Sequence, residues 1–186
     1  MNNSWEEIVI VGFGNHAKTK ILPAIIKTSN AKISLVTQKE VLKKDFHQKY
    51  KCLDQALSKA SKKLFIITNP PKYHYEFCKK VMLNGFDVFV EKPSFLEINH
   101  LRELIEIANE KKIVLFEMLM YLENKKVKET FNLINSQLNN IHSIYTSFNL
   151  PNYPKNTFRN EKDFSSSLFV DMISYPISFV NLINQK

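Results

Sequence analysis

The sequence predicts an α/β protein built on a doubly wound parallel sheet. Short apolar runs recur at residues 7–11, 33–36, 64–67, 86–90 and 113–116. Helix-compatible segments separate them, which is the pattern of βαβ units joined by right-handed crossovers. The chain also has only three glycines in 186 residues, and two of them, Gly12 and Gly14, directly follow the first run. A glycine turn after a buried strand points to the carboxyl edge of the sheet as the place for a ligand.

The first run, residues 7–11, is almost continuously apolar, which is typical of a strand buried on both faces. It leads into the pattern Gly-x-Gly-x-x-Ala and then a helix. In this dinucleotide fingerprint the first glycine permits a tight turn, the second lets the backbone approach a pyrophosphate, and the alanine permits close helix packing. The helix N-terminus offers N–H groups to the phosphates. We therefore predict cofactor contacts, with an ordinary structural turn as the alternative, from Gly12, Phe13, Gly14, Asn15 and His16.

The second strand, residues 33–36, is followed by Thr37, Gln38 and Lys39, with no acidic residue before Glu40. An Asp or Glu at this place would bind the ribose 2′-hydroxyl of NAD. Hydroxyl, amide and ammonium groups instead tolerate a 2′-phosphate, so the pattern leans toward NADP over NAD. An ordinary strand-end turn fits Thr37 and Gln38 equally well.

The third and fourth strands end in polar segments that belong at the same edge of a parallel sheet. Thr68, Asn69, Pro70 and His74 follow the third strand, and Glu91-Lys92-Pro93 ends the fourth. We expect these segments to border the cofactor. The Lys92 ammonium would then donate to a substrate oxygen during hydride transfer. A lysine exposed to solvent is the alternative.

Two helix boundaries carry specific signals. Ser94-Phe95-Leu96-Glu97 has the pattern of a capping box, so we predict a helix over 95–111. Gly85 follows Asn84 at the end of the helical pattern 75–83, where a left-handed residue is expected.

The pattern changes after residue 116. We predict a polar helix at 124–138, an alternating strand at 142–148, a Pro- and Asn-rich loop at 149–160 and an apolar helix at 168–183. A domain change near 118–122 is therefore expected. It gives a dinucleotide-binding domain over 1–118 and part of a substrate domain over 119–186.

Composition excludes several classes of protein. The net charge is +8, but the lysines occur as scattered pairs, which is typical of a solvated surface rather than a nucleic-acid site. No apolar run is long enough for a membrane span and the start has no signal-peptide pattern, so a cytoplasmic protein is expected. Cys52 and Cys78 have no motif spacing and are interpreted as structural. No metal site is predicted, because the remaining histidines, His16, His47, His100 and His142, lack ligand partners at useful spacing.

The chain resembles the Gfo/Idh/MocA oxidoreductases, over nearly its whole length. The motifs occur in the family's order: Val9-Ile10-Val11-Gly12-Phe13-Gly14-Asn15-His16-Ala17, Leu22-Pro23-Ala24, Ile67-Thr68-Asn69-Pro70-Pro71 with His74, Val90-Glu91-Lys92-Pro93, Glu117-Met118-Leu119-Met120-Tyr121, and Asp171-Met172-Ile173-Ser174-Tyr175-Pro176. The resemblance implies a Rossmann-type sheet followed by an α+β substrate domain, NAD(P) as cofactor, and hydride transfer to or from a carbohydrate hydroxyl or ketone.

The resemblance also implies roles for individual residues. Lys92, Asp171 and Tyr175 match the catalytic positions, with Tyr175 exchanging the proton while Lys92 and Asp171 orient it. A half-buried structural aromatic is the alternative for Tyr175. Glu91, Glu117 and Arg159 complete the expected cofactor contacts. The segment 148–159 is most similar to the branch of sugar 3-ketoreductases, which implies a nucleotide-linked keto sugar as substrate.

Two departures from the family pattern keep other functions open. Ser165-Ser166-Ser167 replaces a glycine triplet, so a turn that needs positive φ would be strained. Family members also continue into a large open sheet, so a truncated substrate domain is expected. A cofactor-binding remnant without activity is one alternative. An interaction module whose bare apolar faces are covered by a partner chain is another, and a homo-oligomer is also open.

Overall fold

A computed structural model describes residues 5–41, 46–57, 61–137, 142–143, 145–147 and 167–184. The chain forms two compact units, Met1–Met118 and Leu119–Lys186.

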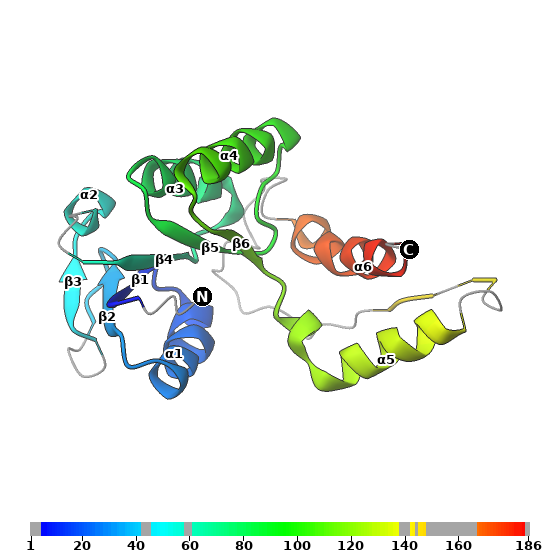
Figure 1. The fold of residues 1–186 in the computed structure, drawn as a ribbon. Helices are drawn as coiled ribbons and strands as arrows, with labels where there is room; N and C mark the ends of the chain where they lie inside the picture. The colour runs from blue at the N-terminus through cyan, green and yellow to red at the C-terminus, as the bar shows by residue number, and fades with distance from the viewer. Residues whose placement is uncertain are drawn as a thin grey trace. The chain divides into compact units, whose positions relative to one another are not determined.

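The first unit contains a parallel sheet of six strands (Figure 1). The strands are β1 (Glu7–Val11), β2 (Lys32–Val36), β3 (Gln48–Tyr50), β4 (Lys63–Ile67), β5 (Asp87–Glu91) and β6 (Leu115–Met118). Their order across the sheet is β3-β2-β1-β4-β5-β6, and every neighbouring pair is parallel. This is the order of a Rossmann fold, which confirms the predicted fold class.

Helices cover both faces of this sheet (Figure 1). A π-helical segment at Ala17–Ile21 continues into α1 (Leu22–Thr28) on one face. On the other face lie α2 (Leu53–Ala56), α3 (His74–Leu83), which a 3-10 turn at Pro71–Tyr73 precedes, and α4 (Ile98–Lys111). The central strands β1 and β4 are buried at every position, so beyond their first residues, Glu7 and Lys63, they carry apolar side chains on both faces.

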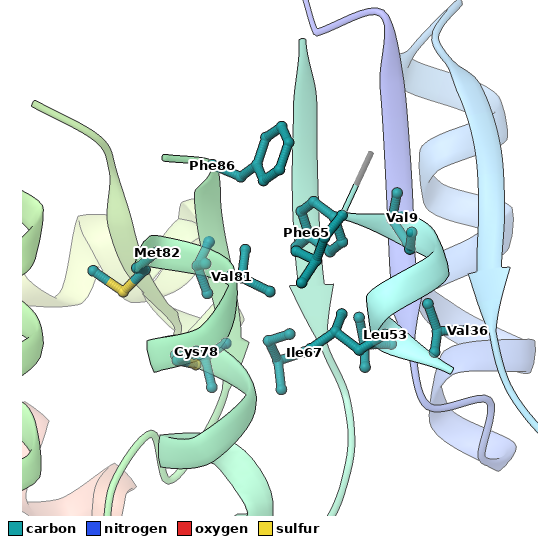
Figure 2. Close-up of a cluster of buried hydrophobic side chains, with 14 of the residues drawn as sticks. Val9, Val36, Leu53, Phe65, Ile67, Cys78, Val81, Met82 and Phe86 are labelled. Carbon is teal, nitrogen blue, oxygen red and sulfur yellow. The ribbon is translucent and has the colours of Figure 1, made fainter. Parts of the chain in front are cut away.

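Two apolar clusters hold the helices on the sheet. Successive residues of β1 alternate between them, because side chains of a strand point to opposite faces. Ile8 and Ile10 pack with α1, while Val9 and Val11 belong to the cluster under α2, α3 and α4. Figure 2 shows part of the second cluster, in which Phe65 and Ile67 of β4 lie near Cys78, Val81 and Met82 of α3. Burial raises the pKa of the Cys78 thiol, as expected for a structural cysteine, whereas Cys52 is exposed.

A buried ion pair lies at the amino edge of the sheet. Lys63 Nζ is 3.2 Å from Glu7 Oε2 and donates to the carbonyl oxygen of Ala56 at 2.9 Å. The hydroxyls of Tyr50 and Ser61 donate to the same carboxylate at 3.3 and 3.2 Å. Burial raises the pKa of Glu7, but hydrogen bonds from neighbouring side chains and the Lys63 charge outweigh it and hold the pKa below its ordinary value.

The end of α3 agrees with the sequence prediction, but the start of α4 does not. Gly85 has φ 81°, and the amides of Gly85 and Phe86 donate to the carbonyls of Met82 and Val81, which is a Schellman motif. The predicted capping box is wrong: α4 begins at Ile98, and its N-cap, Glu97, makes no capping bond through its side chain. Ser94 instead turns its backbone N–H to Glu117.

The second unit contains two of the predicted helices. Asn124 caps α5 (Lys125–Ser136) by accepting from the N–H of Lys126 at 2.9 Å. The apolar helix α6 (Leu168–Asn184) packs against α5, with the rings of Phe131 and Phe179 4.8 Å apart.

Other predictions for this unit differ from the structure or concern residues outside the described ones. At 142–148, the described residues 142–143 and 145–147 are not in a strand, and the others are outside the described residues. The loop 149–160, Ser165 and Ser166 are outside them too. The hydroxyl of Ser167 accepts from the N–H of Val170 at 3.2 Å, as a helix cap, and the backbone strain expected at this residue stays a prediction. Among the described residues no helix is long and apolar enough to cross a membrane.

Replacing Lys63 with methionine should lower the free energy of unfolding by about 3–5 kcal/mol, because the Glu7 carboxylate would stay buried without its cation. The double variant Glu7→Gln/Lys63→Met should recover most of this loss. Urea denaturation near pH 7 measures both. A double variant that is as unstable as Lys63→Met alone would contradict this account of the pair.

The pair should also make stability depend on pH. The folded-state pKa of Glu7 lies below its ordinary value of 4.5, so the unfolded chain binds the proton first. The contribution of Glu7 is therefore complete above that ordinary value and is lost as the pH falls through the folded-state pKa. We expect wild-type stability to fall more steeply in acid than that of the double variant. Equal slopes would speak against this role of Glu7.

Candidate functional site

The turn between β1 and the first helix is fixed by Gly12. Its φ is 85°, a left-handed conformation that side chains rarely adopt, and its N–H donates to the carbonyl of Val36 at 3.0 Å. A Cβ placed on Gly12 would lie 3.1 Å from Cγ and 3.2 Å from the backbone nitrogen of Asn69. Both the backbone conformation and the neighbouring strand end therefore require glycine here.

Gly14 lies in a different environment. Its φ is not positive, and a Cβ placed on it would meet no protein atom within 4 Å. Helical conformation begins at Asn15, and the N–H of Lys18 donates to the carbonyl of Gly14 at 3.0 Å. Ala17 is buried, and Phe13 packs at the edge of the α1 cluster. The fold therefore needs glycine at 12, whereas position 14 borders open space at a helix N-terminus.

The end of β4 is bonded to this turn. The hydroxyl of Thr68 donates to the carbonyl oxygens of Val11 at 3.0 Å and Gly12 at 2.8 Å. The next residue, Asn69, holds a buried Oδ1 with no hydrogen-bond partner among the described residues. Pro70 then caps the 3-10 turn that leads into α3. An orphaned acceptor beside a glycine turn fits a ligand that carries hydroxyl or amide donors as well as phosphate.

The end of β2 forms a tight turn. Thr37 is buried, its N–H donates to the carbonyl of Tyr50 at 3.1 Å, and its hydroxyl accepts from the N–H of Lys39 at 3.2 Å. The side chains of Gln38 and Lys39 are exposed. The first exposed groups after this strand are thus an amide and an ammonium, and the exposed carboxylate of Glu40 follows them.

The end of β5 carries Glu91 and Lys92, both half-buried. Glu91 Oε1 is 3.0 Å from Nε2 of His16, so this pair links β5 to the first turn of the helix that follows Gly14. The Lys92–Pro93 peptide bond is cis, and Pro93 is buried. Residues predicted from three separate motifs therefore meet at one edge of the sheet.

His74 does not point to open space. It is buried, with Nε2 2.7 Å from the carbonyl of Asn69 and Nδ1 3.0 Å from the carbonyls of both Pro93 and Ser94. Burial lowers its pKa, although these carbonyls and the Glu91 charge oppose the shift. Glu117, at the end of β6, accepts the N–H of Ser94 at 2.8 Å. Both side chains are engaged with backbone groups of the neighbouring strand ends.

The other predicted catalytic residues belong to the second unit. Asp171 and Tyr175 occupy positions i and i+4 of α6, where Asp171 is buried and Tyr175 half-buried. The ring of Tyr175 meets that of Tyr121 edge-on at 5.3 Å, and the Tyr121 hydroxyl lies 2.6 Å from Ser178 Oγ. Arg159 is outside the described residues, and among those described no group of three or more His, Cys, Asp or Glu is placed to hold a metal.

The motifs did not reveal the part that Ser94 plays. The sequence predicts a helix cap at Ser94, yet the structure shows its amide bound by Glu117. The contact follows from the parallel register of β5 and β6, in which Val90 lies opposite Glu117, so the chain that leaves β5 passes the end of β6. The sequence motifs carry no signal for this register.

The two glycines of the turn should respond differently to alanine. Gly12→Ala should lower the free energy of unfolding by about 1–3 kcal/mol, because it forces a side chain into positive φ against Asn69. Gly14→Ala should change it by no more than about 0.5 kcal/mol, because the added methyl meets no protein atom. Thermal or urea denaturation of both variants checks this, and equal losses would contradict the geometry.

Comparison with known proteins identifies the family of the first unit. Residues 7–119 match the family described as an oxidoreductase family with an NAD-binding Rossmann fold. A dTDP-3,4-didehydro-2,6-dideoxy-alpha-D-glucose 3-reductase from Actinomadura kijaniata is 25% identical over 114 residues, which are 61% of this chain and 34% of the relative. An uncharacterized oxidoreductase from Synechocystis is 31% identical over 80 residues, 42% of this chain and 22% of that protein. The chain thus spans about a third or less of the length of these curated relatives.

Solved structures share the fold. A 3-ketoreductase from Actinomadura kijaniata, in complex with NADP and TDP-benzene, superposes with a TM-score of 0.84 at 18% identity, over 96% of this chain and 57% of that one. An oxidoreductase from Bacillus cereus gives a TM-score of 0.63 at 23% identity, over 70% and 39% of the two chains. With the family match over more than half of its length, the chain belongs to the Gfo/Idh/MocA oxidoreductases, whose Rossmann fold binds NAD.

Proposed function

We propose that this chain binds NADP(H) or NAD(H) at the carboxyl edge of its sheet and takes part in hydride transfer to or from a carbohydrate hydroxyl or ketone. The observation that carries the proposal is the contrast within the glycine turn. Gly12 is required by the fold, whereas Gly14 borders open space at a helix N-terminus. A backbone left bare at that place suits a pyrophosphate, which binds through N–H groups.

The residues around the turn supply the other contacts of such a cofactor. We assign the phosphates to the amides after Gly14, and a hydroxyl or amide donor of the cofactor to the orphaned Asn69 Oδ1. Gln38 and Lys39 are exposed at the end of β2, and neither carries a negative charge that would repel a 2′-phosphate. This favours NADP over NAD. When bound, the nicotinamide supplies or accepts the hydride.

The roles of the protein's own side chains concern the proton. We assign to Lys92 a hydrogen bond to the substrate oxygen, whose developing negative charge an ammonium stabilises. Tyr175 is assigned the exchange of the proton with that oxygen, and Asp171 the orientation of the donor. The i, i+4 spacing on α6 gives Asp171 and Tyr175 one side of the helix.

We further propose a nucleotide-linked keto sugar as the substrate. Support comes from the relative that reduces a dTDP-linked keto sugar and from the ketoreductase structure that holds NADP and TDP-benzene. A positive net charge of +8 favours an anionic cofactor and an anionic substrate.

One observation favours a second candidate function, an interaction module that a partner chain completes. Large apolar side chains of α6 are exposed: Leu168, Phe169, Ile177 and Val180 are between 49% and 62% accessible. Exposed apolar patches of this kind mark interaction sites. A stable hetero-complex recovered from cells would favour this function, whereas a monodisperse homo-oligomer that binds NADPH would count against it.

Isothermal titration calorimetry with NADPH and with NADH tests cofactor binding. We expect NADPH to bind more tightly, and Gly14→Ala to weaken NADPH binding by at least about tenfold, or 1.4 kcal/mol, while leaving the fold stable. Lys111→Ala, at the end of α4 and away from the carboxyl edge, is the control and should bind like the wild type. If neither dinucleotide binds at millimolar concentration, the proposal fails.

Turnover is tested separately with NADPH and a dTDP-linked 3-keto sugar. Lys92→Ala should lower kcat by about 10²–10⁴-fold, the range expected for a residue that assists proton transfer. NADPH affinity should change far less, because phosphate binding lies in the glycine turn. Binding of NADPH without turnover by the wild type would instead identify a cofactor-binding remnant.

A further inference from the structure

The segment that follows Lys92 is held from both neighbouring strands. It leaves β5 at Glu91 and passes through Pro93 and Ser94 toward α4. Within the described residues its backbone bonds run to two side chains, His74 on the β4 side and Glu117 on the β6 side. A segment fixed from two sides has little freedom to shift along the edge of the sheet.

Among the described residues, every hydrogen-bond partner of His74 is an acceptor. All three partners are backbone carbonyl oxygens, so each bond needs an N–H on the ring nitrogen that makes it. A neutral ring donates from Nδ1 or from Nε2, and only the imidazolium donates from both. Nε2 faces the end of β4, while Nδ1 faces Pro93 and Ser94, just after Lys92. The imidazolium and the Nδ1–H tautomer both supply a donor to the Lys92 side.

Glu117 contacts the same segment as a hydrogen-bond acceptor, whereas His74 contacts its carbonyl groups. Its carboxylate accepts the N–H of Ser94 at 2.8 Å, while the carbonyl of Ser94 faces His74 at 3.0 Å. The Ser94 peptide groups are therefore fixed on both their donor and their acceptor side. Charge-assisted bonds to a carboxylate are stronger than bonds between neutral groups.

We infer that His74 and Glu117 are positioning residues that hold the Lys92 backbone in place, rather than contacts of the cofactor. The value of this placement for catalysis rests on the role proposed above for Lys92, but the placement itself does not depend on cofactor binding. A catalytic ammonium needs its backbone held closely, because small displacements reduce rates strongly.

Two matched pairs of variants separate the contacts. In His74→Asn the side-chain amide nitrogen lies near the place of Nδ1 and keeps a donor toward Pro93 and Ser94. In His74→Gln the amide nitrogen reaches toward the place of Nε2 and keeps the donor toward Asn69 only. Glu117→Gln keeps an acceptor for the Ser94 N–H, whereas Glu117→Ala removes it.

The readout is the rate at which trace acetic anhydride acetylates Lys92 in the protein without cofactor, measured by mass spectrometry. Lys27, exposed on α1, is the internal reference. We expect His74→Gln and Glu117→Ala to change the Lys92 rate by at least about threefold relative to Lys27, equivalent to some 0.65 kcal/mol. His74→Asn and Glu117→Gln should stay close to the wild type.

A loss of stability alone would not produce this pattern, because both His74 variants disturb the same buried position. Unchanged Lys92 rates in all four variants would overturn the inference, and so would equal changes in the conservative and disruptive member of each pair. Weaker NADPH binding with unchanged Lys92 rates would identify the two residues as cofactor contacts instead. If the His74 variants fail to fold, the Glu117 pair decides alone. Because no cofactor is added, the result stands apart from any failure to bind NADPH.

Discussion

The hydrogen bonds from Thr68 to the glycine turn are the interaction on which the site depends. Strands β1 and β4 run parallel in register, with Val11 beside Ile67, so the chain leaves both strands at the same level. Thr68 then joins the two exits: its N–H and its hydroxyl reach the carbonyl of Val11, and the hydroxyl also reaches Gly12. The position of Asn69 against Gly12, which makes glycine necessary there, follows from this link.

Other side chains join neighbouring strand ends along the same edge of the sheet. His74 joins the end of β4 to the segment after β5, Glu117 joins that segment to β6, and the His16–Glu91 pair joins β5 to the first helix. Strand ends carry backbone groups that no ladder satisfies, so the side chains that bind them also fix the loops. The hydrogen bonds that satisfy these strand ends therefore also hold the loops at the carboxyl edge of the sheet in place.

Much of the first unit could be predicted from the sequence because its strands are buried on both faces and read as apolar runs. The bounds of β1 and the left-handed Gly85 follow from local patterns alone. The short β3 and α2, of three and four residues, carry too little periodicity to be recognised. The ion pair of Glu7 and Lys63 could not be predicted from the sequence either, because only the fold brings the two strand starts together.

The errors in the prediction have a common physical cause, which is that tertiary bonds override local ones. Ser94 has the right spacing for a capping box, but Glu117 binds its amide, and the helix starts later. A left-handed backbone conformation also occurs where the sequence has no glycine. Lys112 adopts φ 55° at the end of α4, a conformation usually left to glycine, and Ser167 caps α6 through its hydroxyl.

The claim that the carboxyl edge of this sheet is a dinucleotide site is tested most directly by hydrogen–deuterium exchange with and without NADPH. The account predicts protection in the peptides that contain the glycine turn, the Thr68–Asn69 strand end and the Lys92 segment. Peptides at the amino edge, around the Glu7–Lys63 pair, should exchange at the same rate in both samples. Protection confined to the amino edge, or no protection at saturating NADPH, would contradict the account.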